Sequence, residues 1–292
     1  MHRSIRLTCV TALALVGATA QAASDAGHFD LDLSALGDDA HGRSYDANAV
    51  LTPNARWTLT AGGGSSNADA SGAPLHGTSL DGSAEVHLGS VGVQAGYSHW
   101  NDDDNFSAAT PRLDLSWKPG RVRMRLEFEQ PRFALDYQLR ILAQTVTRSF
   151  AFSGSGTGAG LDWSGAHWSG YLNAMGYSYG NELTRARAIL TTPNLTRFPR
   201  LAALSGSVAT LTHGALKDRA SAGLQYDFTR ASLHADVTRV TDAIFGTQGN
   251  SVGVGVNYVC TGLLSVDLSG GVSHAEGQSA ARYASLTLHL HW

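Results

Sequence analysis

Residues 121–130 read RVRMRLEFEQ, and this segment shows the pattern that decides the fold. Apolar side chains stand at every second position from Val122 to Phe128, and charged side chains stand between them from Arg121 to Glu129. Because neighbouring side chains of a β-strand point to opposite faces, the segment is predicted to be a strand. In water its apolar face would pack against a second sheet. In a membrane that face would contact lipid, and the charged face would line a lumen.

The same alternation recurs in the C-terminal third of the chain. It is clearest over 220–228, 233–238, 252–258, 264–269 and 285–292. Strands of about ten residues are long enough to cross a bilayer when tilted. After residue 22 no stretch approaches the ~18 consecutive apolar residues of a membrane helix. The absence of a repeat of fixed period argues against a soluble β-solenoid.

Connections between the predicted strands fall into two kinds that alternate along the chain. Short turns are predicted at Thr52-Pro53-Asn54, Gly89-Ser90, Lys118-Pro119-Gly120, Ser164-Gly165-Ala166, Thr229-Arg230 and Thr261-Gly262. Longer polar links are predicted at 65–76, 101–109, 243–249 and 275–281. This alternation is typical of the periplasmic turns and extracellular loops of a membrane barrel.

The fold class predicted is all-β, a transmembrane antiparallel up-and-down barrel. The number of strands is about 16, with 14–18 left open, because membrane barrels of this type have an even number. Two stretches leave the count undecided. Residues 132–152 form one long strand or two short ones, and residues 181–218 form one long loop or two further strands.

The N-terminus predicts export. Arg3 and Arg6 precede an apolar run over 7–20, and Ala20-Gln21-Ala22 has the small-residue pattern of a cleavage site. We therefore expect a signal peptide over 1–22 and a single barrel domain over 23–292. Cys260 is then the single cysteine of the mature chain and has no intrachain partner for a disulfide.

Composition narrows the classes of function. Glycine accounts for 33 of 292 residues, charged residues for 15% and hydrophobic residues for 43%. The formal net charge is −3, which gives no electrostatic footprint for nucleic acid, so no nucleic-acid partner is expected. Aromatic residues that fit membrane-interface belts are Tyr97, Trp100, Trp163, Trp168, Tyr177, Tyr179 and Trp292.

The last ten residues, Tyr283 to Trp292, resemble the C-terminal signal of Gram-negative outer-membrane β-barrel proteins. In that family alternating apolar residues and a terminal aromatic residue are read by the barrel assembly machinery. Here the positions that match are Leu286, Leu288, Leu290 and Trp292, and the chain departs from the pattern by ending on Trp rather than the usual Phe. The resemblance implies a porin-like protein in the bacterial outer membrane. Its partners would be membrane lipid, lipopolysaccharide and the assembly machinery, with the oligomeric state left open.

Charges on the predicted inward faces are the candidate functional residues. A basic wall facing an acidic wall would select solutes by the sign of their charge. Alternatively, the charges pair with one another and fill a narrow barrel. The lumen candidates are Arg121, Arg123, Arg125, Glu127, Glu129, Asp136, Arg140, Asp227, Asp236 and Asp267.

Other patterns carry little chemistry. Ser98-His99 and Ser273-His274 suggest a hydrolase, but adjacent strand residues point to opposite faces, so neither dipeptide is itself a nucleophile and its base. The acidic run 102–105 lacks the spaced ligands of a calcium loop. Four alternate glycines over 154–160 lack the strand–helix context of a nucleotide site and suit a flexible extracellular tip with a tight lumen wall. No catalytic residue, metal site or cofactor is predicted.

Three functions follow in order of preference. The first is a passive or weakly selective pore for small hydrophilic solutes. The second is an export pore for a polysaccharide or other polymer, which would need a periplasmic partner. The third is an outer-membrane barrel hydrolase.

Overall fold

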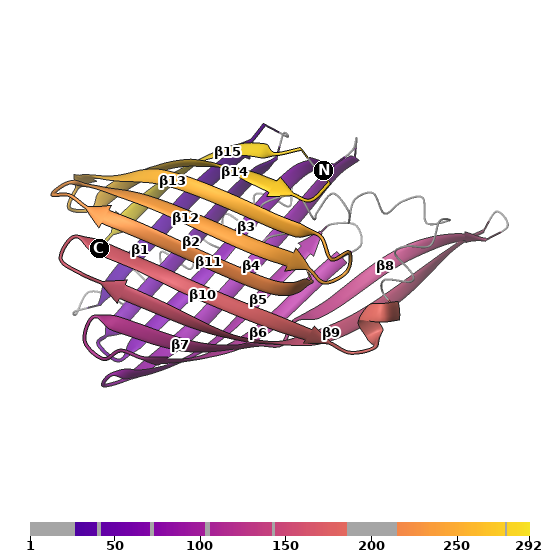
Figure 1. Ribbon diagram of the computed structural model, residues 1–292, viewed down its shortest axis with the longest axis horizontal. Helices are drawn as coiled ribbons and strands as arrows, with labels where there is room; N and C mark the ends of the chain where they lie inside the picture. The colour runs from indigo at the N-terminus through magenta and orange to yellow at the C-terminus, as the bar shows by residue number, and fades with distance from the viewer. Residues whose placement is uncertain are drawn as a thin grey trace.

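The alternating segments form antiparallel strands that make one continuous sheet (Figure 1). The computed structural model describes residues 27–39, 42–70, 73–102, 106–141, 144–185, 215–277 and 279–292. The strands are β1 (His28–Asp38), β2 (Arg43–Asn54), β3 (Trp57–Ala70), β4 (Ala73–Leu88), β5 (Val91–Asp102), β6 (Phe106–Trp117), β7 (Val122–Glu129), β8 (Arg132–Ile141), β9 (Gln144–Ser164), β10 (Trp168–Tyr179), β11 (Leu216–Asp227), β12 (Ala231–Asp242), β13 (Gln248–Thr261), β14 (Leu264–Ala275) and β15 (Ala281–His291).

The sheet closes on itself through its first and last strands. β1 pairs with β15 from Asp30↔His291 to Asp38↔Tyr283. Two further backbone hydrogen bonds join Phe29 and Trp292, at 3.1 and 2.8 Å. This pairing leaves neither β1 nor β15 with a free edge, so backbone groups of both terminal strands are satisfied within the wall. The predicted antiparallel barrel is therefore confirmed.

Fourteen strand positions make up the ring, because β7 and β8 lie end to end along β9. β9 pairs with β7 from Val122↔Trp163 to Glu129↔Gly156 and continues onto β8 from Arg132↔Ser153. Pro131, which has no N–H to donate, separates the two strands, while Gly154 N–H donates to its carbonyl at 2.9 Å. The count lies within the predicted range of 14–18, and 132–152 supplies parts of two strands.

The outer half of β8 and β9 projects beyond the barrel as a hairpin (Figure 1). β9 is 21 residues long, whereas β7, with which it pairs inside the ring, is 8 residues long. Asp136 and Arg140 belong to β8 in this projecting part, and their side chains lie outside the described residues.

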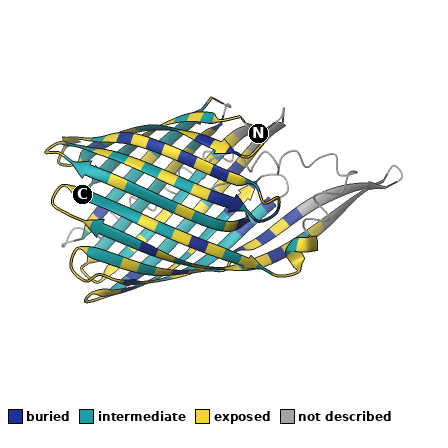
Figure 2. Cartoon of the chain, in the orientation of Figure 1, coloured by how far each residue is buried: buried dark blue, intermediate teal, exposed yellow. Residues whose placement is uncertain are grey.

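The outer face of the barrel is apolar. Leu126, Val254 and Leu268 are 54%, 60% and 60% exposed, and they alternate along their strands with inward polar or glycine residues. Figure 2 shows exposed positions alternating with less exposed ones along many of the strands. An exposed apolar surface that surrounds a whole barrel has no place in water and fits a lipid environment. Exposed aromatic side chains near the end of the barrel that carries the C-terminus are Trp57, Trp117, Trp168, Phe228, Tyr258 and Trp292.

All six predicted short turns lie at or beside hairpin turns at one end of the barrel, where β1 also begins and β15 ends. We call this end the terminal mouth and the other end the loop mouth. Gly89 and Gly120 adopt positive φ angles of 66° and 71° in two of these turns, a conformation that glycine takes without steric cost.

The links predicted at 65–76 and 101–109 are mostly strand. β3 and β4 pair as far as Ala70↔Ala73, and β5 and β6 extend to Asp102 and from Phe106. The sequence did not predict these strand extensions, because they lack alternating apolar side chains. A strand that extends beyond the membrane needs no apolar face. Most of 181–218 lies outside the described residues, apart from 181–185 and the segment from 215, where β11 begins at Leu216. The predicted signal peptide also lies outside them.

Within the described residues, no helix is both long enough and apolar enough to cross a membrane.

Substitutions on the two faces of β12 test which face of the strand points to the lipid and which to the lumen. Val237 is 45% exposed on the outer face, and Thr238 faces inward. We expect Val237→Arg to lower the free energy of unfolding by about 2–4 kcal/mol in phospholipid vesicles, since the charge would enter the apolar layer. Thr238→Arg should cost much less. Urea titrations followed by tryptophan fluorescence measure both; equal costs would contradict the assignment of faces.

Candidate functional site

The inner face of the barrel is rich in carboxylates. Cross-strand partners share a face, and the register therefore assigns each side chain to the lumen or to the outside. Among the described residues below the loop mouth, four arginines face inward: Arg112, Arg123, Arg125 and Arg219. Twelve carboxylates face the same way: Asp30, Asp32, Asp46, Asp81, Glu85, Asp114, Glu127, Glu129, Asp162, Asp227, Asp236 and Asp267.

Ion pairs neutralise the arginines of β7. The guanidinium group of Arg123 contacts the carboxylate of Glu85 on β4 and the hydroxyl of Ser116 on β6. Arg125 reaches Asp162 on β9 through two contacts of 3.2 Å and lies 3.6 Å from Glu127. Glu85 and Glu127 are each 7% exposed. Carboxylates this deeply buried need such partners, because desolvation penalises an unpaired charge.

The same polar network continues across β10 and β11. Asn173 donates to Glu127 at 2.6 Å, and the Tyr177 hydroxyl donates to Glu129 at 2.7 Å. Arg219 lies 3.7 Å from Glu129 on its other side. The inward charges of β7 are therefore paired with polar or charged side chains of strands on both sides of it.

Histidines accompany the acids on the opposite wall. By strand order, β15 lies diametrically across the ring from β7. His234 lies 3.4 Å from Asp267, His289 lies 2.7 Å from Asp32, and His291 lies 2.6 Å from Asp30. Neutral imidazoles leave the carboxylate charge in place, so this wall is acidic when histidine is neutral.

The structure distributes the predicted lumen residues over several places. Arg123, Arg125, Glu127 and Glu129 share one wall, whereas Arg121 lies exposed in the turn before β7. Asp227, Asp236 and Asp267 face inward from β11, β12 and β14 and make no ion pair with the β7 arginines. Sequence reasoning missed Asp30, Asp32, Glu85 and Asp162. Asp30 and Asp32 alternate with Phe29, Leu31 and Leu33, a pattern that could have identified them.

The four alternate glycines belong to β9 and make its lumen face thin. A Cβ atom at Gly156 would lie 2.6 Å from the ring of Tyr177, and one at Gly158 would lie 2.6 Å from the carbonyl oxygen of Ala174. Glycine here allows Met175, Tyr177 and Tyr179 of β10 to lie across β9. The segment is thus a tight lumen wall, as predicted, and not a flexible extracellular tip.

An apolar cluster occupies the inner face near the loop mouth. Phe133 stacks on Phe106 and Phe152, with ring centroids 5.8 and 4.8 Å apart, and Trp100 packs beside Phe106. The members of this mouth cluster are Trp100, Phe106, Ala108, Phe133, Leu135, Phe152, Ala215, Ala243 and Ile244. Ala243 and Ile244 come from the β12–β13 connection, so that connection packs against the wall beneath the projecting hairpin.

Three aromatic residues predicted for the interface belts point inward instead. Trp100 belongs to the mouth cluster, Tyr177 binds Glu129, and Tyr179 donates to the carbonyl of Leu216 at 2.8 Å. Composition alone cannot separate the two faces of a strand, whereas the register does.

The Ser273-His274 dipeptide and the acidic run that begins at Asp102 lie on strands β14 and β5 or directly after them. Ser273 is 5% exposed and His274 is exposed, so the two point to opposite faces as expected. Asp102 accepts a hydrogen bond from the backbone N–H of Phe106 at 3.0 Å, and residues 103–105 lie outside the described part of the chain.

Comparison with known proteins agrees with this architecture. No protein-family model matches the chain, and no curated protein is similar to it in sequence. Outer-membrane-expressed OmpT of Vibrio cholerae has 14% sequence identity, a TM-score of 0.50, and coverage of 92% of this chain and 99% of its own. A monoaromatic hydrocarbon channel, CymD, has 11% identity, a TM-score of 0.53, and coverage of 91% and 87%. The fold is that of outer-membrane β-barrels.

The thin wall of β9 gives a matched pair of glycine substitutions. Gly158→Ala would place a methyl group against the Ala174 carbonyl, whereas a Cβ at Gly176 would meet nothing within 4 Å. We expect Gly158→Ala to cost about 1–3 kcal/mol of unfolding free energy through overpacking. Gly176→Ala should leave stability unchanged or slightly raised. Equal effects in urea titrations of the refolded proteins would contradict the close approach of β10 to β9.

Arg123 and Arg121 provide a second matched pair. Arg123→Ala leaves the buried carboxylate of Glu85 without its guanidinium partner, and we expect a loss of about 1–3 kcal/mol. Arg121→Ala removes an exposed turn residue and should change stability little. The measurement is the urea midpoint at constant slope. A double variant Arg123→Ala/Glu85→Gln that recovers part of the loss would identify the pair as the cause.

Proposed function

We propose that the protein is an outer-membrane channel that conducts small hydrophilic solutes. The observation that carries the proposal is the opposite polarity of the two faces of one closed wall. Leu126 and Phe128 of β7 are 54% and 42% exposed on the outside, while Arg125 and Glu127 of the same strand are held in polar contacts on the inside. A closed sheet that is apolar outside and charged inside fits a membrane pore better than a soluble barrel.

The orientation in the membrane follows from the two ends. Short turns and both ends of the strand series lie at the terminal mouth, which fits the periplasmic side. Exposed Trp57, Trp117 and Trp168 near that end suit the headgroup region, where aromatic side chains concentrate. The predicted signal peptide over 1–22 supports export, and the alternation of Leu286, Leu288 and Leu290 along β15 supports assembly in the outer membrane.

The charge of the lumen favours cations. Below the loop mouth, the described wall carries twelve inward carboxylates and four inward arginines, and each β7 arginine is already paired with an acid. Asp236 and Asp46 have no arginine partner among the ion pairs of the described residues. Charged lumen walls discriminate among permeating ions by sign, so we expect a weak preference for cations.

The mouth cluster fits a limit on solute size. Its aromatic members Trp100, Phe106, Phe133 and Phe152 are 3–6% exposed, so they pack against one another instead of presenting an open apolar path. CymD is described as a monoaromatic hydrocarbon channel. In this chain the inward residues between the mouth cluster and the terminal mouth are mostly polar or charged, which favours hydrophilic solutes.

Polymer export and barrel hydrolysis stay as alternative proposals. Export would require a periplasmic partner that docks at the terminal mouth. Hydrolysis would require a serine and a histidine brought together from different strands.

Ion selectivity tests the proposal directly. In planar bilayers under a salt gradient, the refolded protein should form channels whose reversal potential indicates a cation preference. The double variant Asp236→Asn/Asp267→Asn should shift that potential toward anions, and Arg125→Gln should shift it further toward cations. Glu276→Gln, which changes an exposed residue in the β14–β15 connection, is the matched control. Conductance at background level would overturn the pore.

A further inference from the structure

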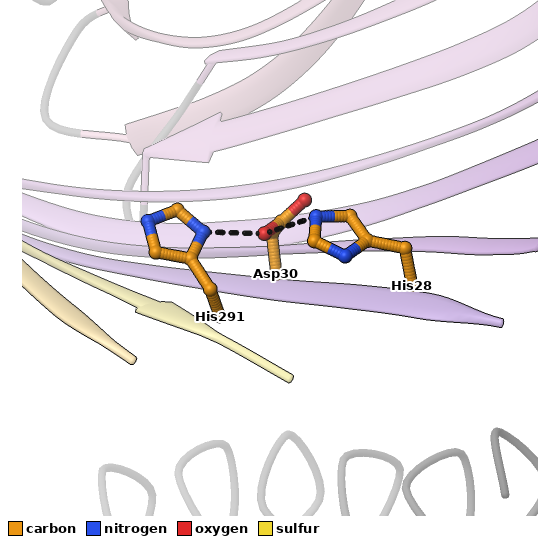
Figure 3. Close-up of side chains that lie close together, drawn as sticks. All are labelled: His28, Asp30 and His291. Atoms are coloured by element: carbon orange, nitrogen blue, oxygen red, sulfur yellow. Dashed lines mark hydrogen bonds and ion pairs between the residues drawn. The ribbon is translucent and has the colours of Figure 1, made fainter. Parts of the chain in front are cut away.

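Three side chains meet at the terminal mouth, on the lumen side of the β1–β15 pairing, which we call the seam (Figure 3). His28 and Asp30 lie on β1, and His291 lies on β15 as the direct cross-strand partner of Asp30. The residues are far apart in the sequence and are brought together only when the first and last strands pair.

The geometry of the group is that of two imidazoles directed at one carboxylate. Nε2 of His28 lies 3.0 Å and Nδ1 of His291 lies 2.6 Å from Oδ1 of Asp30. The two rings are nearly parallel, with an interplanar angle of 13° and centroids 6.4 Å apart. One ligand atom from each residue lies within 4.8 Å of the other two.

These distances are close to those of a metal site. Bonds of about 2.0–2.1 Å to nitrogen and oxygen give ligand–ligand edges of roughly 3.3 Å in a tetrahedron. The two nitrogen–oxygen distances would therefore open by about 0.3 and 0.7 Å, and the two nitrogens, which lie within 4.8 Å of each other, would settle at the same edge length. The side chains can make this adjustment, since His28 and His291 are 60% and 40% exposed. Exposure also leaves the fourth position open to water.

We propose that His28, Asp30 and His291 bind a divalent transition-metal ion of the zinc type across the seam. Two imidazole nitrogens and one carboxylate oxygen suit zinc, nickel or copper, whereas calcium and magnesium prefer oxygen ligands alone. Asp32, which accepts from His289 at 2.7 Å in the next inward layer, adds negative charge nearby. No metal site was predicted from the sequence, because the three ligands come from opposite ends of the chain and no local spacing joins them.

The bound ion would link β1 to β15. This seam is the junction at which the chain closes without a connecting turn. Because the three ligands come together only in the closed barrel, the ion binds the folded state and stabilises it by mass action. The site is independent of whether the lumen conducts.

The test uses untagged refolded protein that begins at Ala23, with zinc as the probe. Isothermal titration should show one saturable zinc site, and zinc should raise the thermal unfolding midpoint, whereas calcium at the same concentration should not. His28→Gln and His291→Gln should each weaken zinc binding at least tenfold and abolish the shift in the midpoint. His274→Gln, which changes an exposed histidine on the outer face, should bind zinc as the unsubstituted protein does.

Two results would overturn the site. One is the absence of saturable zinc binding to the folded protein, and the other is binding that survives His28→Gln/His291→Gln but is lost in His289→Gln. Far-UV circular dichroism and heat-modifiable gel mobility establish that each variant is folded before titration. Absence of zinc binding alongside normal conductance would reject the metal site and leave the channel proposal standing. Zinc binding without conductance would support the metal site and reject the channel proposal.

Discussion

Pairing of β1 with β15 is the interaction on which the rest of the structure depends. A sheet in a membrane has no water to satisfy the N–H and C=O groups of an open edge, so the wall must close. Hydrogen bonds between Phe29 and Trp292 complete that closure at the very end of the chain. Once the ring is closed, each strand has one face toward the lumen and one toward the outside. The alternating polar and apolar residues of the sequence then lie in these two different environments.

Closure also sets how the charges of the lumen are arranged. Arg123 and Glu85 are distant in sequence and meet because β4 and β7 are near neighbours in the ring, with Ser116 of β6 beside them. On the other wall, pairs such as His289–Asp32 depend on the seam itself. One wall therefore pairs its carboxylates with guanidinium groups and the other pairs them with imidazoles, and this asymmetry underlies the proposed cation preference.

The wall is not uniform along its length. Glycines on β9 allow large side chains of β10 to lie flat against it, whereas near the loop mouth aromatic rings from four strands fill the inner face. The mouth cluster also supports the projecting β8–β9 hairpin, whose first inward residues Phe133 and Leu135 belong to it. An apolar support at the mouth and a charged lumen below it are compatible because each lies on a different stretch of the same strands.

The sequence alone determined the fold class, the positions of the turns at the terminal mouth and the inward charges of β7, because these follow from a period of two that is local and repeated. The period-two pattern did not predict the strand extensions at 65–70 and 106–109, since strands that extend beyond the membrane need no apolar face. The partners of each charge, the inward direction of Trp100 and the meeting of His28 with His291 were decided by the tertiary structure. They depend on register and ring closure, which join residues that no local pattern connects.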